Sequence, residues 1–134
     1  MKVLFLDVDG VLNTHRGGYL SLNKKRIKLL QMVVDKTDCK IVLSSTWRKS
    51  DYAMRKLKRH LGYRKMEIYS MTIVLNILRG YEIDEWLSKN RVEKYAIVDD
   101  NDEMLKYQQP YFVLTNPNVG LTIHDVDKLI KILE

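Results

Sequence analysis

The chain has 134 residues, of which 46% are hydrophobic and 30% charged, and this composition suits one globular domain with a single core. No apolar run approaches the ~20 residues that a membrane-spanning helix needs, so we expect no membrane partner. The single cysteine, Cys39, has no second cysteine with which to form an internal disulfide, so we expect a reducing, cytoplasmic location. These features predict one domain over residues 1–134.

The net charge of +6 is concentrated in one segment of the chain. Residues 48–65 hold eight Lys or Arg and one acidic residue, so this segment alone carries +7. Local positive charge of this size favours binding of a polyanion such as nucleic acid. A solvated, basic helix face is the alternative interpretation, and the sequence leaves both open.

Regular elements alternate along the chain. Apolar runs predict five strands, at residues 3–6, 40–44, 67–69, 94–98 and 111–114. Helical periodicity predicts helices from about 23 to 36, 51 to 61, 78 to 87 and 122 to 133. Ser50 is the expected cap of the second helix, and Thr122 with Asp125 forms an expected capping box before the last. The alternation predicts an α/β fold with a mostly parallel sheet of about five strands.

The end of the first strand is the most informative stretch. Two carboxylates, Asp7 and Asp9, follow the strand directly, and Gly10 then allows a sharp turn. At the carboxyl edge of a parallel sheet such residues enter the crevice where ligands bind. Carboxylates this close repel each other unless a cation or a shared proton offsets the repulsion. We therefore predict a Mg²⁺ site that acts on phosphate.

The stretch Asp7-Val8-Asp9-Gly10-Val11 resembles the first motif of the haloacid dehalogenase (HAD) superfamily, and the resemblance covers nearly the whole chain. The second motif, a hydroxyl residue after the second strand, is matched best by Ser44, with Ser45 one position away left open. The third motif, a basic residue at the start of the third helix, is matched by Arg79. The fourth, an acidic pair, is matched by Asp99-Asp100.

Two longer strings resemble the HAD domains of RNA-repair proteins, which are related to the phosphatase half of polynucleotide kinase-phosphatases. They are SSTWR at residues 44–48 and RGYEIDEWL at residues 79–87. The resemblance implies that Trp47 and Arg48 lie near the substrate. Arg48 is then expected to clamp a phosphate, while Trp47 either stacks on a base or packs in the core.

The resemblance also implies a fold and a mechanism. The fold is one three-layer α/β/α Rossmann-like domain with a minimal cap, because only a short flap fits after the first strand. The enzyme is a Mg²⁺-dependent phosphatase in which Asp7 forms an aspartyl-phosphate and Asp9 protonates the leaving oxygen and then activates water. Ser44 and Arg79 hold the phosphoryl group.

The metal ligands that the resemblance implies come from both acidic motifs. Asp7, the backbone carbonyl of Asp9, and Asp100 hold Mg²⁺, and Asp99 supports it directly or through water.

The substrate class depends on the open crevice and on the basic segment. An open crevice suits a phosphate on a large substrate, and segment 48–65 favours an RNA or DNA end such as a 3′-phosphate. One alternative is a phosphatase for a small metabolite or nucleotide, which would show weak salt dependence. Another is a nucleic-acid-binding module with little activity.

Overall fold

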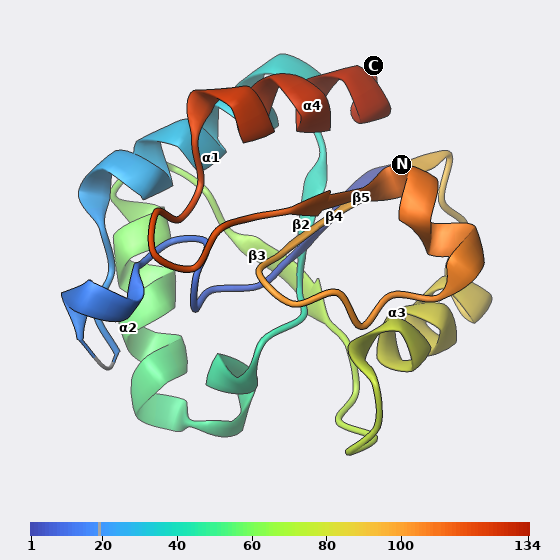
Figure 1. The fold of residues 1–134 in the computed structure, drawn as a ribbon, viewed down its shortest axis with the longest axis horizontal. Coiled ribbons are helices and arrows are strands. Elements are labelled where there is room, and N and C mark those ends of the chain that lie inside the picture. Colours follow the sequence, from blue (N-terminus) through green and yellow to red (C-terminus); the bar gives the residue numbers. More distant parts are fainter. Residues whose placement is uncertain (19) are drawn as a thin grey trace.

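The computed structural model describes residues 1–18 and 20–134, which form a five-stranded sheet between helices (Figure 1). The strands are β1 (Lys2–Leu6), β2 (Lys40–Leu43), β3 (Ile68–Met71), β4 (Lys94–Asp99) and β5 (Phe112–Leu114). The helices are α1 (Lys24–Thr37), α2 (Asp51–Gly62), α3 (Arg79–Ser88) and α4 (Ile123–Leu133). All strand pairs are parallel, in the order β3-β2-β1-β4-β5. The predicted α/β, Rossmann-like architecture is confirmed.

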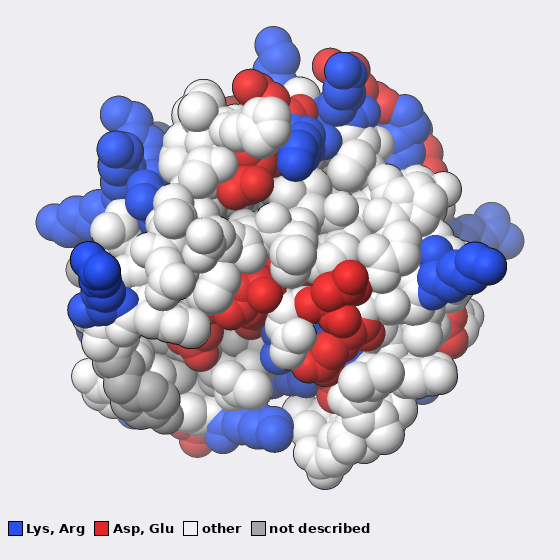
Figure 2. Space-filling model, viewed as in Figure 1, with Lys and Arg blue, Asp and Glu red and all other residues white. Residues whose placement is uncertain are grey.

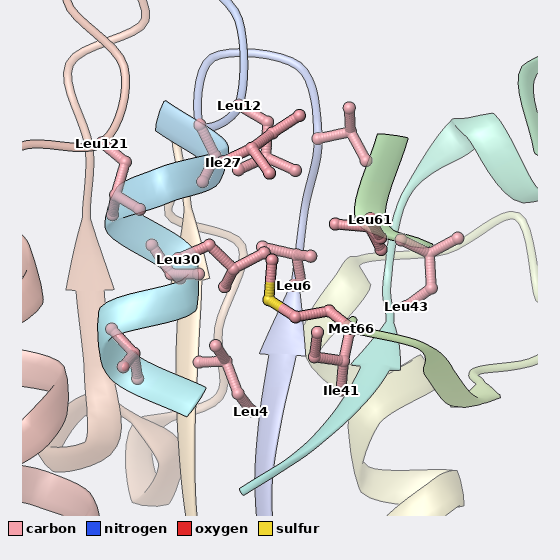
Figure 3. Close-up of a cluster of buried hydrophobic side chains, with 14 of the residues drawn as sticks. Leu4, Leu6, Leu12, Ile27, Leu30, Ile41, Leu43, Leu61, Met66 and Leu121 are labelled. Atoms are coloured by element: carbon pink, nitrogen blue, oxygen red, sulfur yellow. The ribbon is translucent and has the colours of Figure 1, made fainter. Parts of the chain in front are cut away.

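The sheet is covered on both faces, which explains why β1 is apolar at every position from 3 to 6. Leu4 and Leu6 pack into the larger core with residues of α1, α2 and α4. Val3 and Phe5 pack on the opposite face with residues of α3. Figure 3 shows Leu4 and Leu6 in the larger core. Because both faces of β1 are buried, its residues 3–6 are all apolar instead of alternating between apolar and polar residues.

The strand order places a topological switch beside β1. The chain moves outward from β1 to β2 and β3, then crosses back to β4 on the other side of β1. In open α/β sheets the crevice at the carboxyl ends of the strands, where the order reverses, is the usual ligand site. The residues that follow β1 therefore lie at the position where this fold binds ligands.

The connection between β1 and α1 spans residues 7–23, which leaves room for a small flap rather than a large cap. Its one regular element within the described residues is the 3₁₀ turn η1 (His15–Gly17). Two further 3₁₀ turns, η2 (Thr46–Lys49) and η3 (Lys106–Tyr111), were not predicted, since such turns are too short to show apolar periodicity. No helix in the described part of the chain is long and apolar enough to cross a membrane.

The expected helix caps are confirmed. The Ser50 hydroxyl accepts a hydrogen bond from the backbone N–H of Ala53, at 3.2 Å. At α4, the backbone N–H of Asp125 donates to the Thr122 hydroxyl at 3.2 Å, and the Asp125 carboxylate accepts from the Thr122 N–H at 3.0 Å. The N–H groups of Ala53 and Asp125 would otherwise lack a hydrogen-bond partner in the first turn of their helices.

We predict that Thr122→Ala lowers the free energy of unfolding by about 1 kcal/mol, because the first turn of α4 loses its cap. Thr14→Ala is the matched control, since Thr14 precedes η1 and makes no side-chain capping bond. Urea unfolding of both variants measures the difference. Equal losses in the two variants would contradict the capping role.

Candidate active site

The register of the sheet brings three polar side chains into a row. Leu6 pairs with Leu43 on β2 and with Val98 on β4. The residues that follow these three are therefore neighbours across the sheet: Asp7, Ser44 and Asp99. Backbone hydrogen bonds continue the ladder past the strands, from the Asp7 N–H to Val98 O at 3.1 Å and from the Ser44 N–H to Leu6 O at 2.8 Å.

Arg79 joins the two buried carboxylates of this row. Its Nη1 lies 3.0 Å from Asp7 Oδ1 and 2.8 Å from Asp99 Oδ2. The Asp7 and Asp99 side chains are 6% and 1% exposed, and that of Arg79 is 17% exposed. The guanidinium of Arg79 thus bridges the carboxylates at the ends of β1 and β4. The sequence predicted that these two motifs lie close together.

The start of α3 is held close to the loop after β4, and this contact places Arg79. The N–H of Gly80 donates to Glu103 O at 3.0 Å, and the Gln108 side chain donates to Gly80 O at 2.9 Å. A Cβ at position 80 would lie 2.8 Å from Glu103 O and from the backbone N of Leu105. Glycine is therefore needed for the helix to approach this loop.

A third carboxylate completes an acidic cluster. Ligand atoms of Asp7, Asp99 and Asp100 all lie within 4.8 Å of one another. A Cβ at Gly10, whose φ is +77°, would lie 2.4 Å from a carboxylate oxygen of Asp100. The glycine thus serves both the left-handed turn and the close approach of Asp100. Hard divalent cations prefer such groups of carboxylate oxygens.

The electrostatics of the cluster are unfavourable for three ionised carboxylates. Burial, with the neighbouring Asp99 and Asp100 charges, raises the pKa of Asp7 well above its usual value despite Arg79. Burial likewise raises the pKa of Asp99 to about 6, although Arg79 opposes the shift. Burial alone would lower the pKa of Arg79, but the two carboxylates raise it above its usual value. A bound cation would relieve this repulsion.

Asp9 is held in a separate environment from Asp7. Its Oδ1 accepts hydrogen bonds from Asn13 Nδ2 and from the indole Nε1 of Trp47, each at 2.9 Å. The Asn13 side chain also accepts from the Gly10 N–H at 2.9 Å and donates to Ser21 O at 3.0 Å. Oδ2 of Asp9 makes no hydrogen bond with a described residue. The carboxylate is therefore fixed through one oxygen while the other stays available.

Trp47 and Asn13 acquire roles that the sequence left undecided or missed. Trp47 is 3% exposed and belongs to the larger core, which excludes its stacking on a base and supports the alternative of core packing. Asn13 was not predicted as a site residue. Its place in the DVDGVLN string, four residues after Asp9, was the available signal.

The two serines after β2 differ in their partners. Ser45 Oγ accepts from the Trp47 N–H at 3.1 Å and caps η2. Ser44 is 1% exposed, and its Oγ has no hydrogen-bond partner among the described residues. A buried hydroxyl without a partner is rare in folded proteins, so we expect a water or a ligand atom to satisfy the hydroxyl of Ser44.

The contacts of Arg48 form a network that includes none of Asp7, Asp99 and Asp100. Its Nη2 donates to Glu82 Oε1 at 2.7 Å, and its Nη1 donates to Thr72 O at 3.1 Å and to the Thr72 hydroxyl. The other Glu82 oxygen accepts from the Leu75 N–H at 2.8 Å. Both side chains of the ion pair are 5% exposed. The structure thus joins Arg48 to α3 and to the loop after β3, partners that the sequence did not indicate.

Most of the basic segment remains at the surface. Five of its basic residues are exposed on or beside α2: Lys49, Arg55, Lys58, Arg59 and Lys65. In Figure 2, acidic side chains gather near the centre of the face, while Lys and Arg lie around its edges, including the left edge, where Figure 1 shows α1 and α2. The acidic centre and the basic helix are therefore neighbouring but separate features.

Comparison with known families identifies the family of this chain. The family described as the HAD domain in Swiss Army Knife RNA repair proteins matches residues 3–126. The chain belongs to this family. The matched range contains the four motif candidates, which lie between Asp7 and Asp100. No curated protein and no solved structure gives a significant match to the chain.

We predict that Arg48→Met lowers the free energy of unfolding of the HAD domain by about 3–5 kcal/mol, because it leaves the Glu82 carboxylate buried without its cation. Adding Glu82→Leu should restore part of the loss. Urea unfolding of both single variants and the double variant measures the coupling. An unchanged stability with weaker binding of phosphate esters would instead assign Arg48 to phosphate binding.

The raised pKa values of Asp7 and Asp99 predict how metal-free stability depends on pH. Their pKa values are higher in the folded state, so the folded state binds protons more tightly than the unfolded state. The contribution of both groups is fully favourable below about pH 4. That of Asp99 is lost as the pH rises through about 6, and that of Asp7 is lost as the pH rises through its own raised pKa. In EDTA, we expect this loss to appear as a lower Tm at pH 7.5 than at pH 5.5.

Mg²⁺ should raise the Tm more at pH 7.5 than at pH 5.5, since protons compete with the cation for the same carboxylates. Thermal unfolding followed by circular dichroism tests both statements. An equal Mg²⁺ effect at the two pH values would contradict the coupling between cluster ionisation and metal binding.

Proposed function

We propose that this HAD domain is a Mg²⁺-dependent phosphatase that removes a terminal phosphate from nucleic acid through an aspartyl-phosphate. The observation that carries the proposal is the different setting of two neighbouring carboxylates. Asp7 is buried against Arg79, while Asp9 is half-buried and fixed by Asn13 and Trp47. Paired carboxylates in unlike environments suit a nucleophile and an acid–base group.

Each residue of the row has a role in the proposed reaction. An oxygen of Asp7 attacks phosphorus, and the bond from phosphorus to the leaving oxygen breaks as Asp9 protonates that oxygen. Asp9 then takes a proton from water, whose oxygen attacks phosphorus and releases Asp7 and inorganic phosphate. Ser44 Oγ, which has no partner among the described residues, donates to a phosphoryl oxygen. Arg79 offsets the negative charge.

The acidic cluster fits a hard divalent cation. Asp7 and Asp100 are its proposed side-chain ligands, with the backbone carbonyl of Asp9. Asp99 supports the site, because its Oδ2 contacts Arg79 at 2.8 Å and its Oδ1 accepts from the Asn101 N–H at 3.0 Å. When bound, Mg²⁺ neutralises charge so that an anionic carboxylate can approach an anionic phosphate.

The nucleic-acid substrate is supported by the surface beside the site and by the family. The exposed basic residues of segment 48–65 lie on or beside α2, and the matched family is described from RNA repair proteins. The described residues of the connection between β1 and α1 form no large cap over the crevice. An open site accommodates a phosphate at the end of a long chain, and we propose a 3′-phosphate as the terminal group.

The direct test is Mg²⁺-dependent phosphate release from a 3′-phosphorylated oligonucleotide, beside its 5′-phosphorylated counterpart and p-nitrophenyl phosphate. We expect the 3′-phosphorylated strand to have the highest catalytic efficiency, with a strong decrease as salt increases. Asp7→Asn is the control and should abolish release. Activity on the aryl ester alone would support a small-molecule phosphatase, and no release from any substrate would overturn the proposal.

Asp9→Asn separates the acid–base role from the nucleophilic role. We predict a loss of about 10²–10⁴-fold in kcat on the oligonucleotide, whose sugar hydroxyl is a poor leaving group that needs a proton. The loss should be much smaller on p-nitrophenyl phosphate during phosphorylation of the enzyme, since p-nitrophenolate leaves without protonation. Burst kinetics with both substrates measure that step. Equal losses would contradict the assignment of Asp9 as the acid.

A further inference from the structure

A second pocket, separate from the Asp7 cluster, lies between α1 and the end of α2. It has a volume of about 360 Å³ and is lined by Lys24, Ile27, His60, Tyr63 and Arg64. We call it the distal pocket. Two cations, an imidazole and a tyrosine share its wall, and none of these residues belongs to the proposed reaction.

The distal pocket has the chemistry that a nucleotide requires. Tyr63 is 73% exposed, and its ring lies edge-on to that of His60 with centroids 5.7 Å apart. His60 Nδ1 donates to Lys56 O at 2.9 Å, which leaves its Nε2 for another partner. Arg64 Nη1 donates to Gln31 at 3.3 Å. An exposed aromatic ring beside the cations of Lys24 and Arg64 suits a base with its phosphate.

One side of α2 connects the distal pocket with the active site. A proximal pocket of about 260 Å³ is lined by Asp9, Leu20, Thr46, Trp47, Lys49, Ser50 and Ala53. Ala53, Lys56, His60 and Tyr63 recur at helical spacing, so they lie along one side of the helix. Between the two pockets, Lys56 Nζ donates to Leu20 O at 2.6 Å and joins α2 to the loop before α1.

We propose that a single-stranded polynucleotide lies along this side of α2, with its terminal nucleoside in the proximal pocket beside Asp9 and a base further along the strand on Tyr63. This proposal rests on the proposed function, whose substrate it specifies. Lys49 and Lys24 contact phosphates at the two ends of the path. The distal pocket is thus a subsite that selects polynucleotides over mononucleotides.

The distance between the proximal and the distal pocket sets the number of nucleotides that fit along the path. Ten residues separate Ala53 from Tyr63, which corresponds to about 15 Å along a helix. A stacked strand rises ~3.4 Å per step, so about four steps, which join about five nucleotides, span the path. Catalytic efficiency on strands that end in a 3′-phosphate should therefore rise with length up to about five nucleotides and then level off.

The test uses 3′-phosphorylated oligouridylates of one to eight nucleotides with Lys24→Ser/Tyr63→Ala. We expect the variant to lose about tenfold or more in catalytic efficiency on the octamer, from lost stacking and one lost phosphate contact. Its ratio of octamer to monomer activity should fall toward one. Lys40→Ser/Tyr69→Ala is the matched control. It removes an exposed Lys–Tyr pair, with Nζ 5.9 Å from the ring centre, at the amino end of β2 and on β3.

A binding measurement separates this proposal from the proposed function. Fluorescence anisotropy of a labelled 3′-phosphorylated octamer is measured with Asp7→Asn, with and without the distal-pocket substitutions. Affinity about tenfold weaker in the combined variant supports the subsite even if no phosphate is released. Equal affinity, or an equal loss in the Lys40/Tyr69 control, overturns it. Absence of phosphate release together with intact, pocket-dependent binding would overturn only the phosphatase assignment.

Discussion

The contact of one guanidinium group with two buried carboxylates is the interaction on which the site depends. Arg79 Nη1 lies 3.0 Å from Asp7 and 2.8 Å from Asp99, so it holds together residues from the ends of β1 and β4. Without this cation, two carboxylates at the centre of the sheet would face each other at low exposure. Its position follows in turn from the close approach at Gly80, where a side chain would strike the loop after β4.

The charge of the same carboxylates favours the binding of a metal. Arg79 offsets only part of the negative charge of Asp7, Asp99 and Asp100, and the pKa values of Asp7 and Asp99 remain raised. The remaining repulsion makes the cluster receptive to a divalent cation. Asp9 does not share the contact with Arg79, because its hydrogen bonds to Asn13 and Trp47 fix its carboxylate elsewhere.

The positions of Asp7, Ser44 and Asp99 could be predicted because each lies at the end of a short apolar strand. That pattern places Asp7 and Asp99 at one edge of a parallel sheet, and the register confirms that they are neighbours. The partners of individual side chains could not be predicted, since they depend on how separate loops pack. The guanidinium of Arg48 binds Glu82 and Thr72, which lie 34 and 24 residues away, and the sequence indicated neither contact. Its expected contact with a phosphate stays a prediction. The 3₁₀ turn after β2, capped by Ser45, likewise carries no periodic signal.

Covalent labelling of Asp7 tests the proposed mechanism most directly. The protein is mixed with a ³²P-labelled 3′-phosphorylated oligonucleotide and Mg²⁺, quenched in acid within milliseconds, and digested for peptide mapping. We predict one hydroxylamine-sensitive label, on the peptide that contains Asp7, and none in Asp7→Asn. Phosphate release at a normal rate without a labelled protein, or with the label on another residue, would contradict the assignment of Asp7 as the nucleophile.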